Sequence, residues 1–379
     1  MHSKSEESIA LVTPWPPQGS GIADYATGLA KGIRSAGSIV DVFTNAEDVD
    51  GVNCIESVEQ VLPELKRYRR ILFQVGNHPF YHGYMIPLLA ELGRERCVVE
   101  LHDLRLSHIL PGINYQADSD FQVRWLSSNY GEHVEQVDDA HPVSDLLCRL
   151  ASDVIVHSNF VKTRLSQLGV ENIHVVDLAY DLVEVRSPPV QSRTVPTRVG
   201  VFGTFQKNRQ IILVVNALAL LARHGVRNWK LVLAGRRTED FNEIQNAVQT
   251  SGISDLVELH EDPEPKDFIG LINSVDVHVA LRNPTYGETS GVVVQALASA
   301  VPTIVSDVGW YSELPDFVAR IPEHGGLFTL TKILHSYISD AGLRSAIADR
   351  TLQFASKAYD VNFRAAEILS ILLPEEDNK

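Results

Sequence analysis

Short apolar segments alternate with longer amphipathic segments along almost the whole chain. Each apolar segment has the length of a buried strand, and each amphipathic segment carries its apolar residues at helical spacing. This alternation is typical of parallel sheets built from β-α units, so the sequence predicts an α/β protein. Strands are expected at residues 9–13, 39–43, 71–75, 98–101, 154–157 and 173–176 of the first half, and at residues 199–202, 230–234, 257–260, 277–280 and 303–306 of the second.

The chain divides between these two series of strands. Helices are expected at residues 23–35, 160–168, 211–224 and 239–250. Residues 187–196 are rich in proline and polar side chains and can continue neither a strand nor a helix, so they are read as a linker.

Two doubly wound domains are therefore predicted, residues 1–187 and residues 188–350. A last long helical pattern covers residues 343–372. Its C-terminal part, within residues 351–379, is expected to pack back on the first domain.

Composition narrows the class of protein. The 379 residues are 44% hydrophobic and 21% charged, enough to bury a large core. The formal net charge of −15 argues against a nucleic-acid backbone as the main partner. The three cysteines, Cys54, Cys97 and Cys148, form no C-x-x-C pair, so neither a disulfide framework nor a zinc knuckle is expected.

The apolar runs also bear on location. The first residues hold no apolar stretch of signal-peptide length, and the longest apolar run, residues 211–222, is too short to cross a bilayer. A cytosolic protein is expected. The basic run at residues 66–70 is a candidate for peripheral contact with anionic headgroups at the inner face of a membrane. A solvated helix end is the favoured explanation of that run, because the acidic balance of the first half opposes adsorption.

The first segment with chemical potential lies where the first strand leads into the first helix. Gly19 and Gly21 flank Ser20 there. Glycines at such a turn let the backbone approach a ligand and aim free amides at an anion. A β-α turn that only needs a positive φ explains them equally well.

Polar residues also follow the middle strands. His102 and Asp103 end the fourth strand, and ligands in open parallel sheets lie beyond the carboxyl ends of strands. His102 can exchange a proton near neutral pH, although a histidine at a strand end is more often a structural hydrogen-bond partner. Asn77 and Tyr81, after the third strand, are candidates for acceptor contacts, and core packing is the alternative for the aromatic residue.

The second half carries two further segments. Gly203 follows a strand and precedes Lys207 and Arg209, two cations at the mouth of a helix where a diphosphate would be stabilised. A solvated turn is the alternative. Glu288 stands in a polar loop before an apolar helix. It is either a ligand-binding acid or a helix-capping acid.

Taken in order, these segments resemble a known family. The glycine turn near the N-terminus, His-Asp after a middle strand, and the glycine turn with cations are followed by P-T-Y-G-E-T-S-G and A-L-A-S-A-V-P-T-I-V-S-D-V-G-W. The set resembles the retaining glycosyltransferases of family four, which have the GT-B fold. The resemblance covers nearly the whole chain and is strongest over residues 282–315.

The resemblance implies two Rossmann-like domains that face a cleft. The C-terminal domain would hold a nucleotide sugar, with UDP or GDP as the expected nucleotide, and the N-terminal domain would hold the acceptor. The implied activity is retaining transfer of a hexose-type sugar to a hydroxyl of a glycan, glycolipid or small molecule. No metal or other cofactor is expected, because the sequence has no compact Asp/His cluster with ligand spacing and the cations can replace Mg²⁺.

The resemblance also assigns roles to individual residues by their positions in the shared motifs. The resemblance implies that Arg209 neutralises the donor diphosphate with Lys207 as a helper, and that the turn at residues 19–21 lies near the phosphates and the acceptor. It places His102 beside the transferred sugar, with Asp103 as a less secure neighbour. Glu288 matches the first acid of the family's paired glutamates, which holds sugar hydroxyls.

The same comparison assigns the amides of Thr289, Ser290 and Gly291 to sugar or phosphate oxygens, and shows two departures. Gln295 stands where a second glutamate normally grips the ribose, and Thr204 replaces the basic residue usual after Gly203. Two other functions therefore stay open: a nucleotide-sugar epimerase or hydrolase, and a sugar-nucleotide-binding partner with weakened catalysis.

Overall fold

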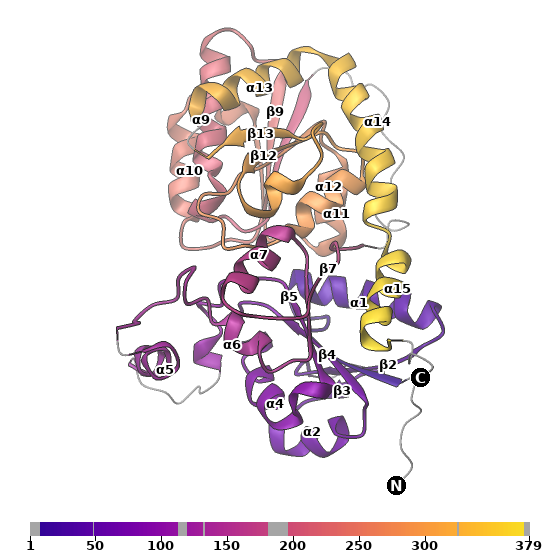
Figure 1. Ribbon diagram of the computed structural model, residues 1–379. Coiled ribbons are helices and arrows are strands. Elements are labelled where there is room, and N and C mark those ends of the chain that lie inside the picture. Colours follow the sequence, from indigo (N-terminus) through magenta and orange to yellow (C-terminus); the bar gives the residue numbers. More distant parts are fainter. Residues whose placement is uncertain are drawn as a thin grey trace. The chain divides into compact units, whose positions relative to one another are not determined.

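The computed structural model describes residues 8–47, 49–112, 120–131, 133–180, 196–323 and 326–374. The chain forms two compact units (Figure 1). Unit 1 comprises residues 1–179, 286–289 and 361–379, and unit 2 comprises residues 180–285 and 290–360. The predicted linker at residues 187–196 lies outside the described residues except for Pro196.

The described part of unit 1 holds a seven-stranded parallel sheet in the order β3-β2-β1-β4-β5-β6-β7. The order reverses beside β1, which is the place where doubly wound sheets bind ligands. β1 and β5 are buried at every position, so both faces of the sheet are covered. The strands are β1 (Ser8–Val12), β2 (Ile39–Thr44), β3 (Asn53–Cys54), β4 (Arg70–Val75), β5 (Cys97–Leu101), β6 (Asp153–Val156) and β7 (Ile173–Val175).

The α-helices of unit 1 lie between its strands along the chain, except for α15. This helix comes from the end of the chain and packs on α1 (Figure 1). They are α1 (Gly21–Ser35), α2 (Val58–Leu65), α3 (Pro79–His82), α4 (Met85–Leu92), α5 (Phe121–Tyr130), α6 (Ser144–Cys148), α7 (Asn159–Gln167) and α15 (Val361–Leu372).

The described part of unit 2 repeats the plan with six parallel strands in the order β10-β9-β8-β11-β12-β13. The strands are β8 (Thr197–Phe202), β9 (Trp229–Gly235), β10 (Val257–Glu261), β11 (Val277–Ala280), β12 (Thr303–Asp307) and β13 (Ala319–Pro322). The helices are α9 (Ile211–Arg223), α10 (Phe241–Thr250), α11 (Pro265–Asn273), α12 (Gly291–Ala298), α13 (Leu327–Ser339) and α14 (Ala341–Ala358).

The α/β prediction is confirmed, and each strand expected from the sequence lies within about two residues of an observed one. The sequence missed β3 and β13. Both are short and lie at an edge of their sheet, so they carry too few buried positions to give a readable pattern.

The single helical pattern expected at residues 343–372 is wrong, because the structure divides it into α14 and α15. Tyr359 leaves the helical conformation, and Asp360 forms an isolated parallel bridge with Tyr180. Residues 351–358 therefore continue α14 within unit 2, and only α15 joins unit 1.

Close approach of α15 to α1 depends on a glycine. A β-carbon at Gly32 would lie 2.9 Å from Cβ of Ala365 and 3.1 Å from the carbonyl oxygen of Val361. A β-carbon at Gly28, one turn earlier, would make only an ordinary contact of 3.7 Å with Val361. The two positions therefore form a matched pair on one helix.

We expect Gly32→Ala to lower the free energy of unfolding by about 1–3 kcal/mol, because the methyl group forces α1 and α15 apart. Gly28→Ala should be neutral or stabilising by up to about 1 kcal/mol, because alanine favours the helix. Urea unfolding followed by circular dichroism measures both. Equal stability of the two variants would contradict this account of the packing.

Candidate functional site

The turn after β8 in unit 2 is built around Gly203 and Arg209. Gly203 has a φ of +108°, and a β-carbon on Gly235 at the end of β9 would lie 1.6 Å from the Gly203 carbonyl oxygen, so this turn packs directly on its neighbour. The Arg209 guanidinium folds over the turn. Its Nη1 donates to the Phe202 carbonyl at 3.1 Å and its Nε to Oγ1 of Thr204 at 3.1 Å. The structure thus fixes one cation at the carboxyl end of β8.

Lys207 lies close by in sequence but is directed to another partner. Its Nζ is 3.0 Å from Oε2 of Glu243 and 4.0 Å from Oδ1 of Asp240, on and next to α10. The hydrogen bond to Glu243 raises the pKa of Lys207. Of the two cations predicted to serve a diphosphate, only Arg209 lies on the Gly203 turn.

Backbone contacts join the carboxyl ends of neighbouring strands in unit 2. The Asn283 amide donates to the Asn208 carbonyl at 2.8 Å, which links the loop after β11 to the loop after β8. The Arg282 amide donates to Oγ of Ser306 on β12 at 2.9 Å. The loops at this edge are therefore held in a fixed arrangement.

The sequence analysis did not select Arg282, which lies at this edge. Arg282 is 4% exposed, and its guanidinium lies 5.7 Å from the ring centre of Tyr311. An arginine directly after an apolar strand was the available signal. Arg282 is a further candidate for the site.

The amino end of α12 follows the same edge. Ser290 is the N-cap, and its hydroxyl accepts from the Val293 amide. A β-carbon at Gly291 would lie 2.2 Å from the Tyr180 hydroxyl, so the glycine is needed for that approach. Gln295 lies on the same helix and is partly exposed. The capping role that the sequence left open for Glu288 therefore belongs to Ser290.

Residues 286–289, which include Glu288, pack within unit 1 on the segment after β5. The Arg105 amide donates to the Tyr286 carbonyl at 3.2 Å, and a β-carbon at Gly287 would lie 2.5 Å from Cβ of Leu104. Glu288 accepts from the Tyr286 amide at 2.7 Å. The Glu288 side chain is thus held by a backbone amide of the same loop.

Glu288 lies near enough to Asp103 to affect its charge. Burial and the negative charge of Glu288 raise the pKa of Asp103 to about 7, against a hydrogen bond from the Asn77 amide at 3.1 Å. The structure therefore brings three of the predicted site residues together. The Asn77 side-chain oxygen also accepts from the His108 amide at 2.7 Å, so Asn77 holds the loop.

His102 directly follows β5, and its amide donates to the Val75 carbonyl at 2.9 Å. Its ring lies 5.3 Å from the ring of Tyr25 and 4.8 Å from that of His157. Burial lowers the pKa of His102 well below its usual value, and electrostatic repulsion from His157 and His82 lowers it further. Its Nε2 is buried and has no hydrogen-bond partner among the described residues.

Tyr81, the aromatic candidate for acceptor contacts, stacks on His78, with ring centres 4.1 Å apart.

The turn before α1 is a helix cap. The Ser20 hydroxyl accepts from the Ile22 amide at 3.2 Å. Gly21 does not need a positive φ, and a β-carbon there would meet no atom within 4 Å. The space beside Gly21 is therefore open, and ligand contact at this turn stays a prediction.

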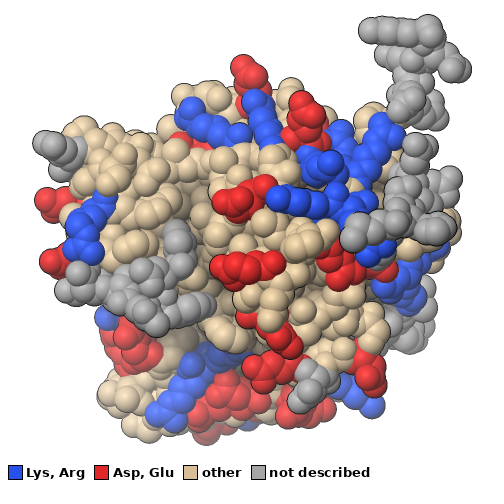
Figure 2. All heavy atoms as spheres, turned by 90° about the horizontal axis from the view of Figure 1, so that it is seen from below, with Lys and Arg blue, Asp and Glu red and all other residues tan. Residues whose placement is uncertain are grey.

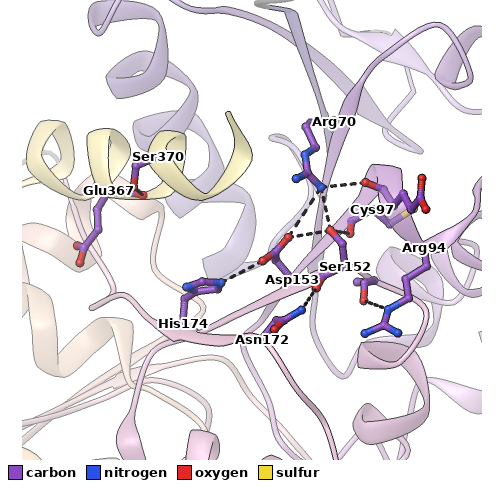
Figure 3. Close-up of polar contacts among 11 residues, drawn as sticks. Arg70, Arg94, Cys97, Ser152, Asp153, Asn172, His174, Glu367 and Ser370 are labelled. Atoms are coloured by element: carbon purple, nitrogen blue, oxygen red, sulfur yellow. Dashed lines mark hydrogen bonds and ion pairs between the residues drawn. The ribbon is translucent and has the colours of Figure 1, made fainter. Parts of the chain in front are cut away.

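A second polar network lies at the opposite, amino-terminal edge of the unit 1 sheet (Figure 3). Nη1 of Arg70 donates to Oγ of Ser152 at 2.8 Å and lies 3.8 Å from Oδ2 of Asp153, whose other oxygen is 3.1 Å from Nε2 of His174. Arg70 belongs to the basic run at residues 66–70, so one cation of that run already serves the fold.

The charged surface gives no uniform positive face in the view of Figure 2, where basic and acidic side chains are interspersed. Contact of the basic run with anionic headgroups stays a prediction.

None of the helices in the described ranges is both long and apolar enough to cross a membrane.

Solved structures of other proteins share the fold of this chain. The chain shares its fold with sucrose-phosphate synthase from Thermosynechococcus elongatus, at 16% identity over 96% of this chain and 98% of that chain, with a TM-score of 0.71. It is also similar to Anabaena Alr3699/HepE in complex with UDP-glucose, at 17% identity over 96% and 100% of the two chains and a TM-score of 0.70. The glycosyltransferase WaaG, involved in lipopolysaccharide biosynthesis, matches at 12% identity over 97% and 100%, with a TM-score of 0.66.

These likenesses show the GT-B fold, which confirms the predicted fold class. Residues 196–328 match the family model described as glycosyl transferases group 1. The match covers most of unit 2, including Gly203 and Arg209, and also residues 286–289 of unit 1, which include Glu288. It confirms the resemblance to this group of glycosyltransferases. No curated protein sequence matches the chain.

The raised pKa of Asp103 predicts how stability depends on pH. From pH 4 to pH 7 the folded protein keeps this carboxyl protonated, whereas the unfolded chain has lost the proton. The stabilising contribution is therefore complete below the unfolded pKa of 3.8 and is lost as the pH rises through about 7.

We compare the free energies of unfolding of the wild type and Asp103→Asn by urea titration, with a chelator present. The wild-type value minus the variant value should fall as the pH rises from about 4 to about 7. Asp316→Asn is the control, because the Asp316 side chain is 86% exposed. A difference that stays flat with pH would contradict a raised pKa for Asp103.

Proposed function

We propose that this protein is a retaining glycosyltransferase that moves a hexose-type sugar from a nucleotide sugar to a hydroxyl of a glycan, glycolipid or small-molecule acceptor. The observation that carries the proposal is the position of Arg209. The guanidinium lies on the glycine turn at the carboxyl end of β8, inside the segment that matches the glycosyltransferase group 1.

The cations of unit 2 would serve the leaving group. Departure of a nucleoside diphosphate concentrates negative charge on phosphate oxygens, and a preorganised cation stabilises that charge without reorganisation. Arg209 would supply the charge, and the free amides of Gly291 and Thr289 near the start of α12 would add hydrogen bonds. Lys207, paired with Glu243, would contribute less than Arg209.

The sugar would be oriented by Glu288 and His102. A carboxylate holds sugar hydroxyls with charge-assisted hydrogen bonds, and a neutral imidazole can donate or accept one. The low pKa of His102 keeps its ring neutral at pH 7, so it would act as a hydrogen-bonding group. Retention would follow from attack by the acceptor on the face that the diphosphate leaves, with the diphosphate taking up the acceptor's proton.

Donor and acceptor are proposed from chemistry and likeness. UDP-glucose is the first donor to examine, because Alr3699/HepE was solved with it. Gln295 would hydrogen-bond the ribose as a neutral partner. On the acceptor side, Asn77, Tyr81 and Asp103 of unit 1 are the candidates, and no metal is required by this scheme.

We expect Arg209→Ala to weaken UDP binding in isothermal calorimetry by about tenfold to a hundredfold, the loss of charge-assisted hydrogen bonds worth about 1.5–3 kcal/mol. Arg223→Ala is the matched control, because Arg223 is exposed in the last turn of α9. GDP is titrated in parallel. Equal affinity of the Arg209 variant and the control for every nucleotide bound by wild type would contradict the role of Arg209.

A second variant tests the sugar contact. Glu288→Gln keeps an oxygen that can accept from the Tyr286 amide but removes the charge, so we expect kcat to fall by about tenfold to a hundredfold while the protein stays folded. The control is Glu323→Gln, which changes an exposed residue next to β13. Unchanged turnover in Glu288→Gln would argue against this assignment.

The same assay separates transfer from the alternative reactions. Turnover of the nucleotide sugar is followed with and without acceptor. Product that requires an acceptor supports transfer, whereas equal release of sugar or an epimerised donor without acceptor supports the hydrolase or epimerase.

A further inference from the structure

Three side chains from two neighbouring strands of unit 1 converge at the carboxyl edge of its sheet. Glu100 is the fourth residue of β5, and His102 follows that strand two positions later, on the same side. His157 follows β6, which pairs with β5 in parallel register, Leu101 opposite Val156. One oxygen of Glu100 and one ring nitrogen of each histidine all lie within 4.8 Å of one another.

The hydrogen bonds of His157 fix which nitrogen faces Glu100. Nδ1 lies 2.8 Å from the Val176 carbonyl, which only accepts, so Nδ1 carries the proton and donates. Nε2 therefore presents a lone pair in the neutral ring. This atom is buried, has no hydrogen-bond partner among the described residues, and lies 3.7 Å from Oε1 of Glu100.

Glu100 is itself held by two donors. The Tyr25 hydroxyl donates to Oε1 at 2.5 Å, and the Gln74 amide group donates to Oε2 at 2.8 Å. The residue is 0% exposed. Oε1 keeps a second lone pair that is available on the side of His157.

This pattern is the one that surrounds metal ligands. A ligating histidine donates its other ring N–H to a carbonyl or carboxylate, and a ligating carboxylate is hydrogen-bonded in turn. Two ligand atoms of a tetrahedral zinc ion, each about 2.0–2.1 Å from the metal, lie roughly 3.4 Å apart. The 3.7 Å between Nε2 of His157 and Oε1 of Glu100 is close to that spacing.

A proton on Nε2 of His157 explains less than a metal ion does. It would pair His157 with Glu100, but at 3.7 Å the two atoms are too far apart for a hydrogen bond. It would also leave the buried Nε2 of His102 without a partner. A cation between the three side chains satisfies both histidines and the carboxylate together.

We propose that Glu100, His102 and His157 bind one divalent transition-metal ion, with Zn²⁺ the best match to two imidazoles and one carboxylate. Glu100 and His157 are buried and His102 lies at the carboxyl edge of the sheet, so a fourth ligand would come from that edge. Binding requires the three side chains to draw closer together, because their ligand atoms lie within 4.8 Å of one another and those of one zinc ion lie roughly 3.4 Å apart. The proposal does not depend on the proposed transferase activity, but the two share His102: an ion bound to one ring nitrogen would leave only the other for a sugar hydroxyl.

The test uses untagged full-length protein treated with a chelator and then dialysed, without any nucleotide sugar. Isothermal calorimetry with Zn²⁺ should give one site per chain, and the melting temperature should rise with Zn²⁺. Co²⁺ should give the visible absorption bands of a tetrahedral nitrogen and oxygen site. No saturable binding by the wild-type protein would overturn the proposal.

Variants separate this site from adventitious surface binding. His157→Asn keeps a donor that can reach the Val176 carbonyl but removes Nε2, and should lower Zn²⁺ affinity by at least about 100-fold, since even outer-shell partners cost 10–100-fold. His108→Asn is the control, an exposed histidine of the same unit. Equal losses in the two variants, or none in His157→Asn, would contradict the assignment.

A further variant covers the case in which His157→Asn does not fold. Glu100→Gln keeps an acceptor for the Tyr25 hydroxyl and removes the charge, so it should weaken Zn²⁺ binding and alter the Co²⁺ spectrum. An unchanged Co²⁺ spectrum in a folded Glu100→Gln protein would overturn the proposal. Because UDP binding through Arg209 is measured separately, failure of either proposal can be recognised without the other.

Discussion

Parallel pairing of the strands is the constraint on which both candidate sites depend. In a parallel sheet every carboxyl end lies at one edge, so each loop that leaves a strand meets the loops of its neighbours. In unit 1 this brings Glu100 and His102, after β5, next to His157, after β6. In unit 2 it brings the Gly203 turn after β8 to the Asn283 loop after β11. An antiparallel order would separate these groups by the length of a strand.

Glycines allow the loops at these edges to pack in direct contact with one another. Gly235 admits the carbonyl of Gly203, and Gly203 in turn admits the guanidinium of Arg209, each at a distance that a side chain would occupy. Gly287 does the same for the loop that carries Glu288, against Leu104. The positions of the charged groups therefore depend on residues that have no side chain, and the bulk of a methyl group at any of these positions would displace a functional side chain.

The two units handle charge in different ways. Unit 2 presents a cation, Arg209, on backbone and hydroxyl acceptors, where it can exchange those neutral partners for an anionic ligand. Unit 1 buries acids and histidines together, so burial shifts their protonation toward neutral forms at Asp103 and His102. A neutral imidazole and an uncompensated carboxylate are also what a metal ion requires of its ligands. The chemistry proposed for unit 1 would therefore be sensitive to pH and to cations, whereas that proposed for unit 2 would suit phosphates.

The sequence by itself determined the α/β class, the positions of the main strands along the chain and the residues that end them, because apolar runs and glycine turns are local properties that each segment shows on its own. The match over residues 196–328 confirmed the group that the motifs resemble. Tertiary structure decided what depends on partners distant in sequence. It directed Lys207 to Glu243, split the last helical pattern at Tyr359, and joined His157 to Glu100 across 57 residues. No spacing rule within one segment could find that last cluster, because its ligands come from two strands that become neighbours only when the sheet forms.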